Sequence, residues 1–174
     1  MSLKDLIEKV NNGDSVTALK KEFCHELEQL EEIKSILDSS KEKMESFKLP
    51  VIPSDYYVEL SEAVDAIENM AIELNKKPIS IKTLNLRVDT ARDLVLKLYK
   101  NTSETIKNAS LAESTIVYSN RFRVAGKINN ALNRAEDYFY DGKYNEALEV
   151  AIKAVSEVNP NIYNEVMIAK NKIL

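Results

Sequence analysis

The chain has 174 residues, of which 44% are hydrophobic and 30% are charged, and it contains 3 glycines and 4 prolines. This length suits one domain, or one elongated helical unit with a small appendage, and the composition favours helix. The net charge of −4 and the pI near 5.2 exclude a general electrostatic attraction to nucleic acid or to an anionic membrane surface.

The first third of the sequence predicts a long helix. Residues 3–12 form a short amphipathic piece that ends at Asn11-Asn12-Gly13. After it, an apolar residue recurs every seven positions, which is typical of a coiled-coil seam. A companion series at the same interval has two polar members, Glu26 and Ser40, and we expect these to fix the register or to lie near the edge of a bundle. The seam residues are Val16, Phe23, Leu30, Leu37 and Met44.

Two further helices follow, each separated from the previous one by proline. Pro50 and Pro53 end the first helix, because proline has no N–H donor and restrains the residue before it. The second helix spans 57–74, and the residues expected on its buried face recur three and four positions apart: Tyr57, Leu60, Val64, Ile67, Ala71 and Leu74. Ser80 can cap the third helix, whose stripe of small and apolar residues begins at Ile81. Three long helices with two short connections predict an antiparallel up-down-up bundle over residues 1–123.

Residues 124–174 predict a helical hairpin plus a final helix. Apolar spacing indicates helices over 125–140 and 144–158, with Gly142 placed as the left-handed residue after the first. The small residues and the glycine turn are typical of a tetratricopeptide-like hairpin, but only one copy is present. We therefore interpret it as a cap or docking unit and not as a peptide-binding solenoid.

The stripe of the third helix changes character at its end. After Ile116 the next two steps fall on Ser119 and Arg123, where the pattern asks for aliphatic side chains. No acidic residue lies between Glu113 and Glu136. Four cations occupy this acid-free window: Arg121, Arg123, Lys127 and Arg134.

Two interpretations of this segment stay open. Tyr118 and Phe122 are four residues apart and share a face if the helix persists, and arginine with aromatic residues is the combination that interfaces favour. The alternative is structural: Asn120 ends a helix, and Arg121 and Arg123 bond to its terminal carbonyl groups.

The chain has little equipment for catalysis, so an enzyme is not expected. Glu22 and His25 have the spacing of di-iron bundles, but those sites need two such motifs, and this is the only histidine. We expect no metal and no other cofactor. The single cysteine, Cys24, is expected to be a half-buried thiol in a reducing compartment. No phosphate loop or nucleophile motif is present, and no run approaches the roughly 20 apolar residues that span a bilayer, so the chain is expected to be soluble.

Three stretches together resemble a known family. They are Leu49-Pro50-Val51-Ile52-Pro53-Ser54-Asp55-Tyr56, the segment 109–123, and the segment 135–148. They are similar to the C-terminal part of the septation ring formation regulator EzrA, over roughly residues 45–160. The resemblance implies spectrin-like helical bundles on the cytoplasmic side of the cell membrane, at the division septum. It also implies that the membrane is reached only through an N-terminal anchor absent from this chain.

The family carries a short motif, Gln-Tyr-Gly-Asn-Arg-Tyr-Arg, associated with recruitment to mid-cell. Val117 and Ser119 stand where the family has glutamine and glycine. The resemblance implies a partner, the tubulin-like protein FtsZ or another cell-division protein, and is compatible with a homo-oligomer. The alternative is a passive spectrin-like spacer with no direct FtsZ contact. The residues implied to bind the partner are Tyr118, Asn120, Arg121, Phe122 and Arg123.

Overall fold

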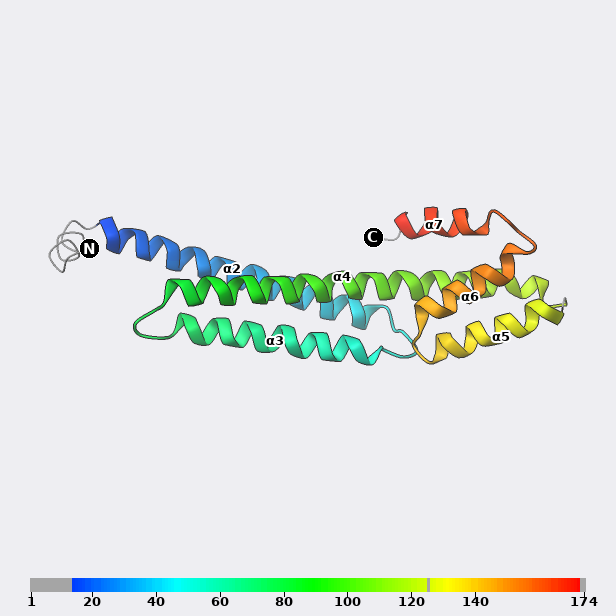
Figure 1. Cartoon of the computed structure of the whole chain (residues 1–174), viewed down its shortest axis with the longest axis horizontal. Coiled ribbons are helices and arrows are strands. Elements are labelled where there is room, and N and C mark those ends of the chain that lie inside the picture. Colours follow the sequence, from blue (N-terminus) through cyan, green and yellow to red (C-terminus); the bar gives the residue numbers. More distant parts are fainter. Residues whose placement is uncertain (1–13, 125, 173–174) are drawn as a thin grey trace. The chain divides into compact units, whose positions relative to one another are not determined.

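The computed structural model describes residues 14–124 and 126–172. Within them lie six α-helices and one 3-10 helix and no strand, which confirms the all-α prediction (Figure 1). The short helix expected over 3–12 lies outside the described residues, as does the side chain of Val16. The specific likeness to a spectrin repeat stays a prediction. The elements are α2 (Asp14–Ser46), α3 (Ser54–Leu74), α4 (Ile81–Ser119), η1 (Asn120–Phe122), α5 (Gly126–Tyr140), α6 (Tyr144–Ser156) and α7 (Ile162–Lys172).

Packing divides the described residues into two compact units. The first unit combines residues 14–38 with 61–96, and the second combines 39–60 with the described residues from 97 onward. Helices α2, α3 and α4 therefore each contribute residues to both units. The sequence predicts a different division, into a bundle over 1–123 and a hairpin with a final helix over 124–174. Whether those two parts fold independently stays a prediction.

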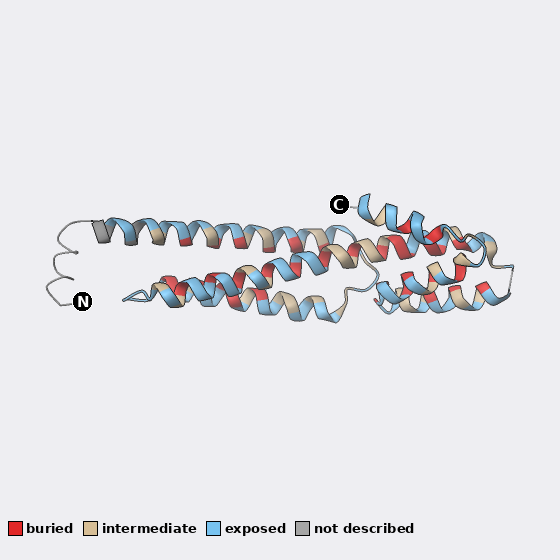
Figure 2. Cartoon of the chain, turned by 45° about the horizontal axis from the view of Figure 1, so that its top comes forward, coloured by how far each residue is buried: buried red, intermediate tan, exposed pale blue. Residues whose placement is uncertain are grey.

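The first unit is built from antiparallel stretches of α2, α3 and α4 (Figure 1). Their buried residues form stripes along the helices, at the spacing that the sequence predicts (Figure 2). As expected, Ser80 caps α4, because its Oγ accepts a hydrogen bond from the Thr83 N–H at 3.4 Å. The core residues of this unit are Leu30, Ile33, Leu37, Ala63, Ala66, Ile67, Met70, Leu74, Leu84, Val88, Ala91 and Val95.

Two details of the seams differ from the prediction. Of the two roles expected for Glu26 and Ser40, a place near the bundle edge is wrong, since both side chains are buried, whereas fixing the register stays a prediction. One carboxylate oxygen of Glu26 has no hydrogen-bond partner in the part of the chain that the structure describes. On α3 the buried face is offset from the predicted one: Tyr57 is 55% exposed, and Ala63 and Ala66 lie in the core instead. Small residues at a contact let two helices approach closely, so apolar size alone misplaces the face.

The second unit contains the expected helical hairpin, α5 and α6, followed by α7. Gly142 has a φ of 78°, which confirms the left-handed turn between α5 and α6. The turn is closed by hydrogen bonds from the Gly142 N–H to the Phe139 carbonyl at 3.1 Å and from the Lys143 N–H to the Tyr138 carbonyl at 2.8 Å. Residues from α4, α6 and α7 share one core, formed by Leu111, Ala112, Ala147, Leu148, Val155, Ile162 and Val166.

The proline-rich connection between α2 and α3 is fixed to this hairpin. The buried Tyr144 hydroxyl donates to the Val51 carbonyl at 2.6 Å and accepts a hydrogen bond from the Val51 N–H at 3.3 Å. A Cβ on Gly142 would lie 3.1 Å from Cγ1 of Val51, so Val51 would have to shift slightly to admit a larger residue. Burial raises the pKa of Tyr144, and the hydrogen bond to Val51 acts in the opposite direction.

Candidate functional site

Helix α4 ends at Ser119, the first of the two positions where the predicted stripe loses its aliphatic side chains. Ser119 is nevertheless fully buried, and its Oγ donates a hydrogen bond to the Thr115 carbonyl. Thr115 is also buried and donates its Oγ1 proton to the Leu111 carbonyl at 2.7 Å. Because each hydroxyl is satisfied within the helix, these polar residues occupy core positions without an unpaired donor. At Ser119 the change in the stripe is therefore structural.

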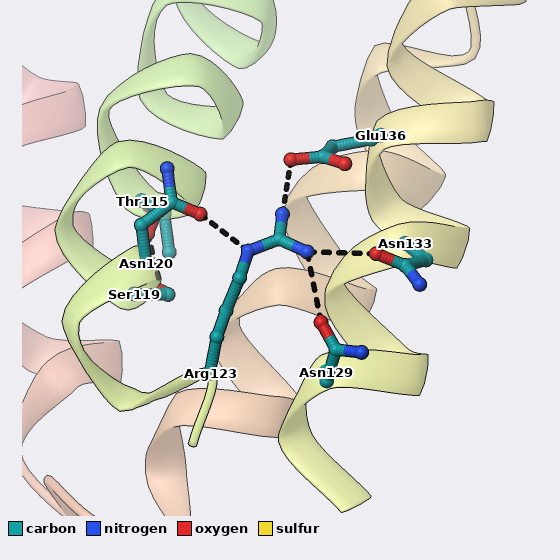
Figure 3. Close-up of polar contacts among 7 residues, drawn as sticks. All are labelled: Thr115, Ser119, Asn120, Arg123, Asn129, Asn133 and Glu136. Carbon is teal, nitrogen blue, oxygen red and sulfur yellow. Dashed lines mark hydrogen bonds and ion pairs between the residues drawn. The ribbon is translucent and has the colours of Figure 1, made fainter. Parts of the chain in front are cut away.

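Arg123, the second position, is held by a set of acceptors (Figure 3). Its Nε donates to Asn120 Oδ1 at 2.7 Å, and Nη1 donates to Asn129 Oδ1 at 3.1 Å and to Asn133 Oδ1 at 2.7 Å. Nη2 forms an ion pair with the carboxylate of Glu136. The Arg123 side chain is 26% exposed. We call this set of five residues the arginine clamp.

The clamp ties the end of α4 to α5. Asn120 belongs to η1, whereas Asn129, Asn133 and Glu136 all lie on α5, and η1 packs against α5. A guanidinium group has five N–H donors in a fixed planar fork, which suits several acceptors from different elements. Sequence reasoning missed these α5 partners. Their spacing of four and then three residues places them on one helical face, and that polar stripe was visible in the sequence.

Tyr118, Arg121 and Phe122 form a second group, on the helix end itself. The guanidinium carbon of Arg121 lies 4.4 Å from the centroid of the Tyr118 ring, a cation–π geometry. Arg121 Nε also donates to the Tyr118 carbonyl at 3.1 Å, as the structural interpretation expected. The rings of Tyr118 and Phe122 meet edge to face, with centroids 5.7 Å apart.

Exposure separates the five predicted residues. Asn120 and Arg121 are exposed, while Tyr118, Phe122 and Arg123 are half-buried. Tyr118 and Phe122 pack with one side against core clusters of the second unit. The structure therefore brings all five together at one helix end, and it turns the Arg123 guanidinium toward α5.

Three cations of the acid-free window have no acidic partner among the described residues. In the described chain, Arg121 has no acidic partner, and neither do Lys127 and Arg134, which are exposed on α5. Val117, next to Tyr118, is 63% exposed. Arg121 over an aromatic ring, beside an exposed valine, is a surface suited to contact an acidic or apolar group of another molecule.

The structure also bears on metal binding, on Cys24 and on membrane crossing. Among the residues it describes, no group of three or more His, Cys, Asp and Glu side chains could hold a metal ion. His25 exchanges a hydrogen bond with Gln29 at 2.6 Å. Cys24 is exposed, and the prediction of a half-buried thiol is wrong because Cys24 lies off the buried face of α2. None of the described helices combines the length and the apolar character needed to cross a membrane.

Comparisons with known proteins agree on one family. The family model described as "Septation ring formation regulator, EzrA" matches residues 2–169. The chain is 33% identical over 134 residues to the septation ring formation regulator EzrA of Geobacillus sp. (strain WCH70), a match covering 76% of this chain and 24% of the relative. It is 34% identical over 140 residues to EzrA of Geobacillus kaustophilus (strain HTA426), covering 80% of this chain and 25% of the relative.

A more distant relative extends the match along the chain. EzrA of Listeria innocua serovar 6a is 28% identical over 164 residues, covering 91% of this chain and 28% of the relative. The chain thus spans about a quarter of the length of the curated relatives that it matches. No solved structure was found to match it.

Proposed function

The chain belongs to the EzrA family of septation ring formation regulators, and from this premise we propose that it regulates cell division by binding a protein of the division machinery. The partner is FtsZ or a protein near it at the septum, and the segment acts by contact, without catalysis or cofactor. The contact surface is the end of α4, formed by Tyr118, Asn120, Arg121 and Phe122. We call these four residues the motif surface.

The observation that carries this proposal is the environment of the Arg121 side chain. Its guanidinium stacks on Tyr118 and has no acidic partner in the described chain. Stacking limits the rotamers of Arg121 before a partner arrives, so less side-chain entropy is lost on binding. Arginine and tyrosine are the residue types that most often dominate binding energy at an interface.

The five predicted residues then divide by role. Tyr118, Asn120 and Arg121 contact the partner, and Phe122 supports the Tyr118 ring from the core side. Arg123 holds the surface in place through the arginine clamp. Its bond to Asn120 Oδ1 leaves the amide NH₂ of Asn120 as the group available to a partner.

Alanine substitution of Arg121, with Arg134→Ala as the control, tests the proposal. Arg121→Ala should weaken binding of the chain to FtsZ polymers by more than about tenfold, because truncating a central arginine anchor costs about 2 kcal/mol or more. Its melting temperature should stay close to that of the wild type, since Arg121 is exposed. Co-sedimentation with FtsZ polymers measures the binding.

Arg134→Ala is the matched control, because Arg134 is an exposed, unpaired arginine on α5. It should bind nearly as well as the wild type. If wild-type chain neither co-sediments with FtsZ nor changes the polymer yield, FtsZ is not the partner and the passive spacer is favoured. If Arg121→Ala and Arg134→Ala weaken binding equally, general positive charge and not the motif surface accounts for the contact.

A further inference from the structure

A second surface lies where the proline-rich connection between α2 and α3 meets the turn between α5 and α6 (Figure 1). A groove of about 310 Å³ lies there, wholly within the second unit. It contains no residue of the motif surface. Its lining comes from the α2–α3 connection, the later part of α4 and the end of α5, and includes Phe47, Lys48, Pro50, Glu113, Phe139 and Tyr140.

Aromatic rings of this groove are accessible to another molecule. Tyr140 is 67% exposed, more than any other aromatic side chain that the structure describes, and Phe47 is 45% exposed. The half-buried Phe139 meets the Tyr140 ring edge to face, with centroids 5.7 Å apart. Exposed aromatic residues around a hollow are typical of interaction sites, because such residues are enriched at interfaces relative to the rest of a protein surface.

The position of Phe47 in the sequence makes its exposure unusual. Phe47 continues the seven-residue series of Ile33 and Ser40, which are 2% and 0% exposed. It is also the first residue after α2, and Lys48 follows it with a φ of 47°, a left-handed conformation that glycine or asparagine usually adopts after a helix. The chain therefore turns at the point where the series would bury Phe47, and nearly half of this side chain is left uncovered.

Polar groups of the groove are free to bond to an occupant. In the described chain, the Tyr140 hydroxyl and the Lys48 ammonium group have no hydrogen-bond or ion-pair partner. Both can donate to carbonyl oxygens. Glu113 is exposed and forms no ion pair among the described residues, so its carboxylate can accept from a cation.

These groups favour an extended, proline-rich occupant over a helix. A helix uses its own N–H groups to satisfy its backbone carbonyls, and it has little need of donors from a groove. A polyproline II segment has no internal hydrogen bonds, so all its carbonyls are open to donors. Its prolines have no N–H groups that would need acceptors. Aromatic-lined grooves bind such segments because the polyproline II conformation is preformed and little entropy is lost on binding.

From these features we propose that the groove binds a proline-rich segment of a partner protein, in the polyproline II conformation and next to a basic residue. The rings of Phe47 and Tyr140 contact the prolines of the segment. The Tyr140 hydroxyl and Lys48 donate to its carbonyl oxygens, and Glu113 pairs with its basic residue. This site is separate from the motif surface and does not depend on the function proposed there.

Nuclear magnetic resonance of the whole isotopically labelled chain tests the proposal. The probe is the peptide acetyl-Arg-Pro-Pro-Leu-Pro-Pro-amide, used in this order and in the reverse order. The tighter binder of the two is compared with a counterpart that has alanine in place of every proline. The proline probe should shift the signals of Phe47 and Tyr140 saturably and bind at least about fivefold more tightly than the alanine peptide. Equal affinities, shifts that do not saturate, or shifts centred on other residues would overturn the proposal.

A second copy of the chain is the competing occupant of the groove. Without a probe, the signals of Phe47 and Tyr140 should not change with the concentration of the chain. If raising that concentration shifts these signals and prevents the proline probe from binding, the groove is an interface between copies and the proposal is wrong.

A probe with glutamine in place of arginine tests the role of Glu113. It should bind the wild-type chain about two- to fivefold more weakly, as expected for the loss of an exposed ion pair, and Glu113→Gln should remove this difference. Glu165→Gln, which alters an exposed acid on α7 outside the groove, should keep it. A Glu113→Gln chain that keeps the full preference for arginine would refute the pairing of Glu113 with a basic residue.

Substitution of Tyr140 separates binding from folding. Tyr140→Ala should weaken binding of the proline probe by about fivefold or more, because truncation of an aromatic anchor is costly at an interface. Its melting temperature and its amide signals away from the groove should match those of the wild type, since Tyr140 is 67% exposed. Tyr163→Ala is the matched control, because Tyr163 is 56% exposed on α7, outside the groove. Equal binding by the two variants would contradict the proposal.

Discussion

Replacing Arg123 by alanine removes the centre of the arginine clamp and should destabilise the second unit. Four acceptors lose their donor at once: the side-chain oxygens of Asn120, Asn129 and Asn133, and the carboxylate of Glu136. Three of these groups lie on α5, so the substitution removes the polar link between η1 and that helix and leaves the packing of Phe122. The main effect of Arg123→Ala should therefore be reduced stability, and any reduced binding should follow from it.

The size of the effect follows from the exposure of the groups. The Arg123 and Glu136 side chains are 26% and 37% exposed, so their ion pair contributes about 0.5–1 kcal/mol. Hydrogen bonds from a charged donor add more, but Asn120 and Asn133 are exposed and can bond to water instead. A total of about 2 kcal/mol is expected, which corresponds to roughly 4–8 °C in melting temperature for a chain of this length. Arg123→Lys should lose about half as much, because the ammonium group keeps the charge and loses the fork.

Thermal and urea unfolding, followed by circular dichroism, measure this prediction, with Arg134→Ala as the exposed control. A double-mutant cycle of Arg123→Ala with Glu136→Gln isolates the ion pair and should give a coupling free energy of about 0.5–1 kcal/mol. The outcome that refutes the reasoning is an Arg123→Ala chain that melts with the wild type yet fails to bind FtsZ polymers. In that case Arg123 contacts the partner directly.

Two further predictions concern buried polar groups. Tyr144→Phe should lower the free energy of unfolding by about 1 kcal/mol in urea titrations, because both hydrogen bonds to Val51 are lost. Burial raises the pKa of Tyr144 above the unfolded value of about 10. The free energy of unfolding should therefore be constant below that pH and fall as pH rises through the folded pKa. If the free energy of unfolding of Tyr144→Phe fell equally steeply at alkaline pH, this explanation would be wrong. Glu26→Leu should raise the free energy of unfolding by about 1 kcal/mol, because Glu26 is buried with an unpartnered oxygen, while Glu28→Leu on the exposed face should have little effect.

Local rules account for most of the fold. The periodic stripe of α4 was predictable over its whole length, because a helix that packs on one side must repeat apolar residues at its own period. The connection between α2 and α3 follows from Pro50 and Pro53, and the turn at Gly142 from the conformational freedom of glycine. The buried face of α3 was less accessible to this reasoning, because the small residues Ala63 and Ala66 lie in the core while the large Tyr57 is exposed.

The sequence predicted where the candidate site lies, but not the role of each residue in it. Residue type alone grouped Arg121 with Arg123, as two arginines beside two aromatic rings. In the structure, Arg121 stacks on Tyr118 and stays exposed, whereas Arg123 turns to acceptors on α5. Which arginine is free depends on what a neighbouring helix presents, and that is a property of packing.

The amino-acid sequence by itself determined the helices, the turns between them and the helix end where the candidate site lies, because these depend on residues close together in the chain. The tertiary structure alone decided that Ser119 stays in the core, that Glu26 is buried with an unpartnered oxygen, and that Arg123 is clamped to Asn129, Asn133 and Glu136. The physical reason is that burial and the partners of a polar side chain depend on what neighbouring elements present, and only the packing of separate helices covers Ser119, buries Glu26 and brings the α5 acceptors to Arg123.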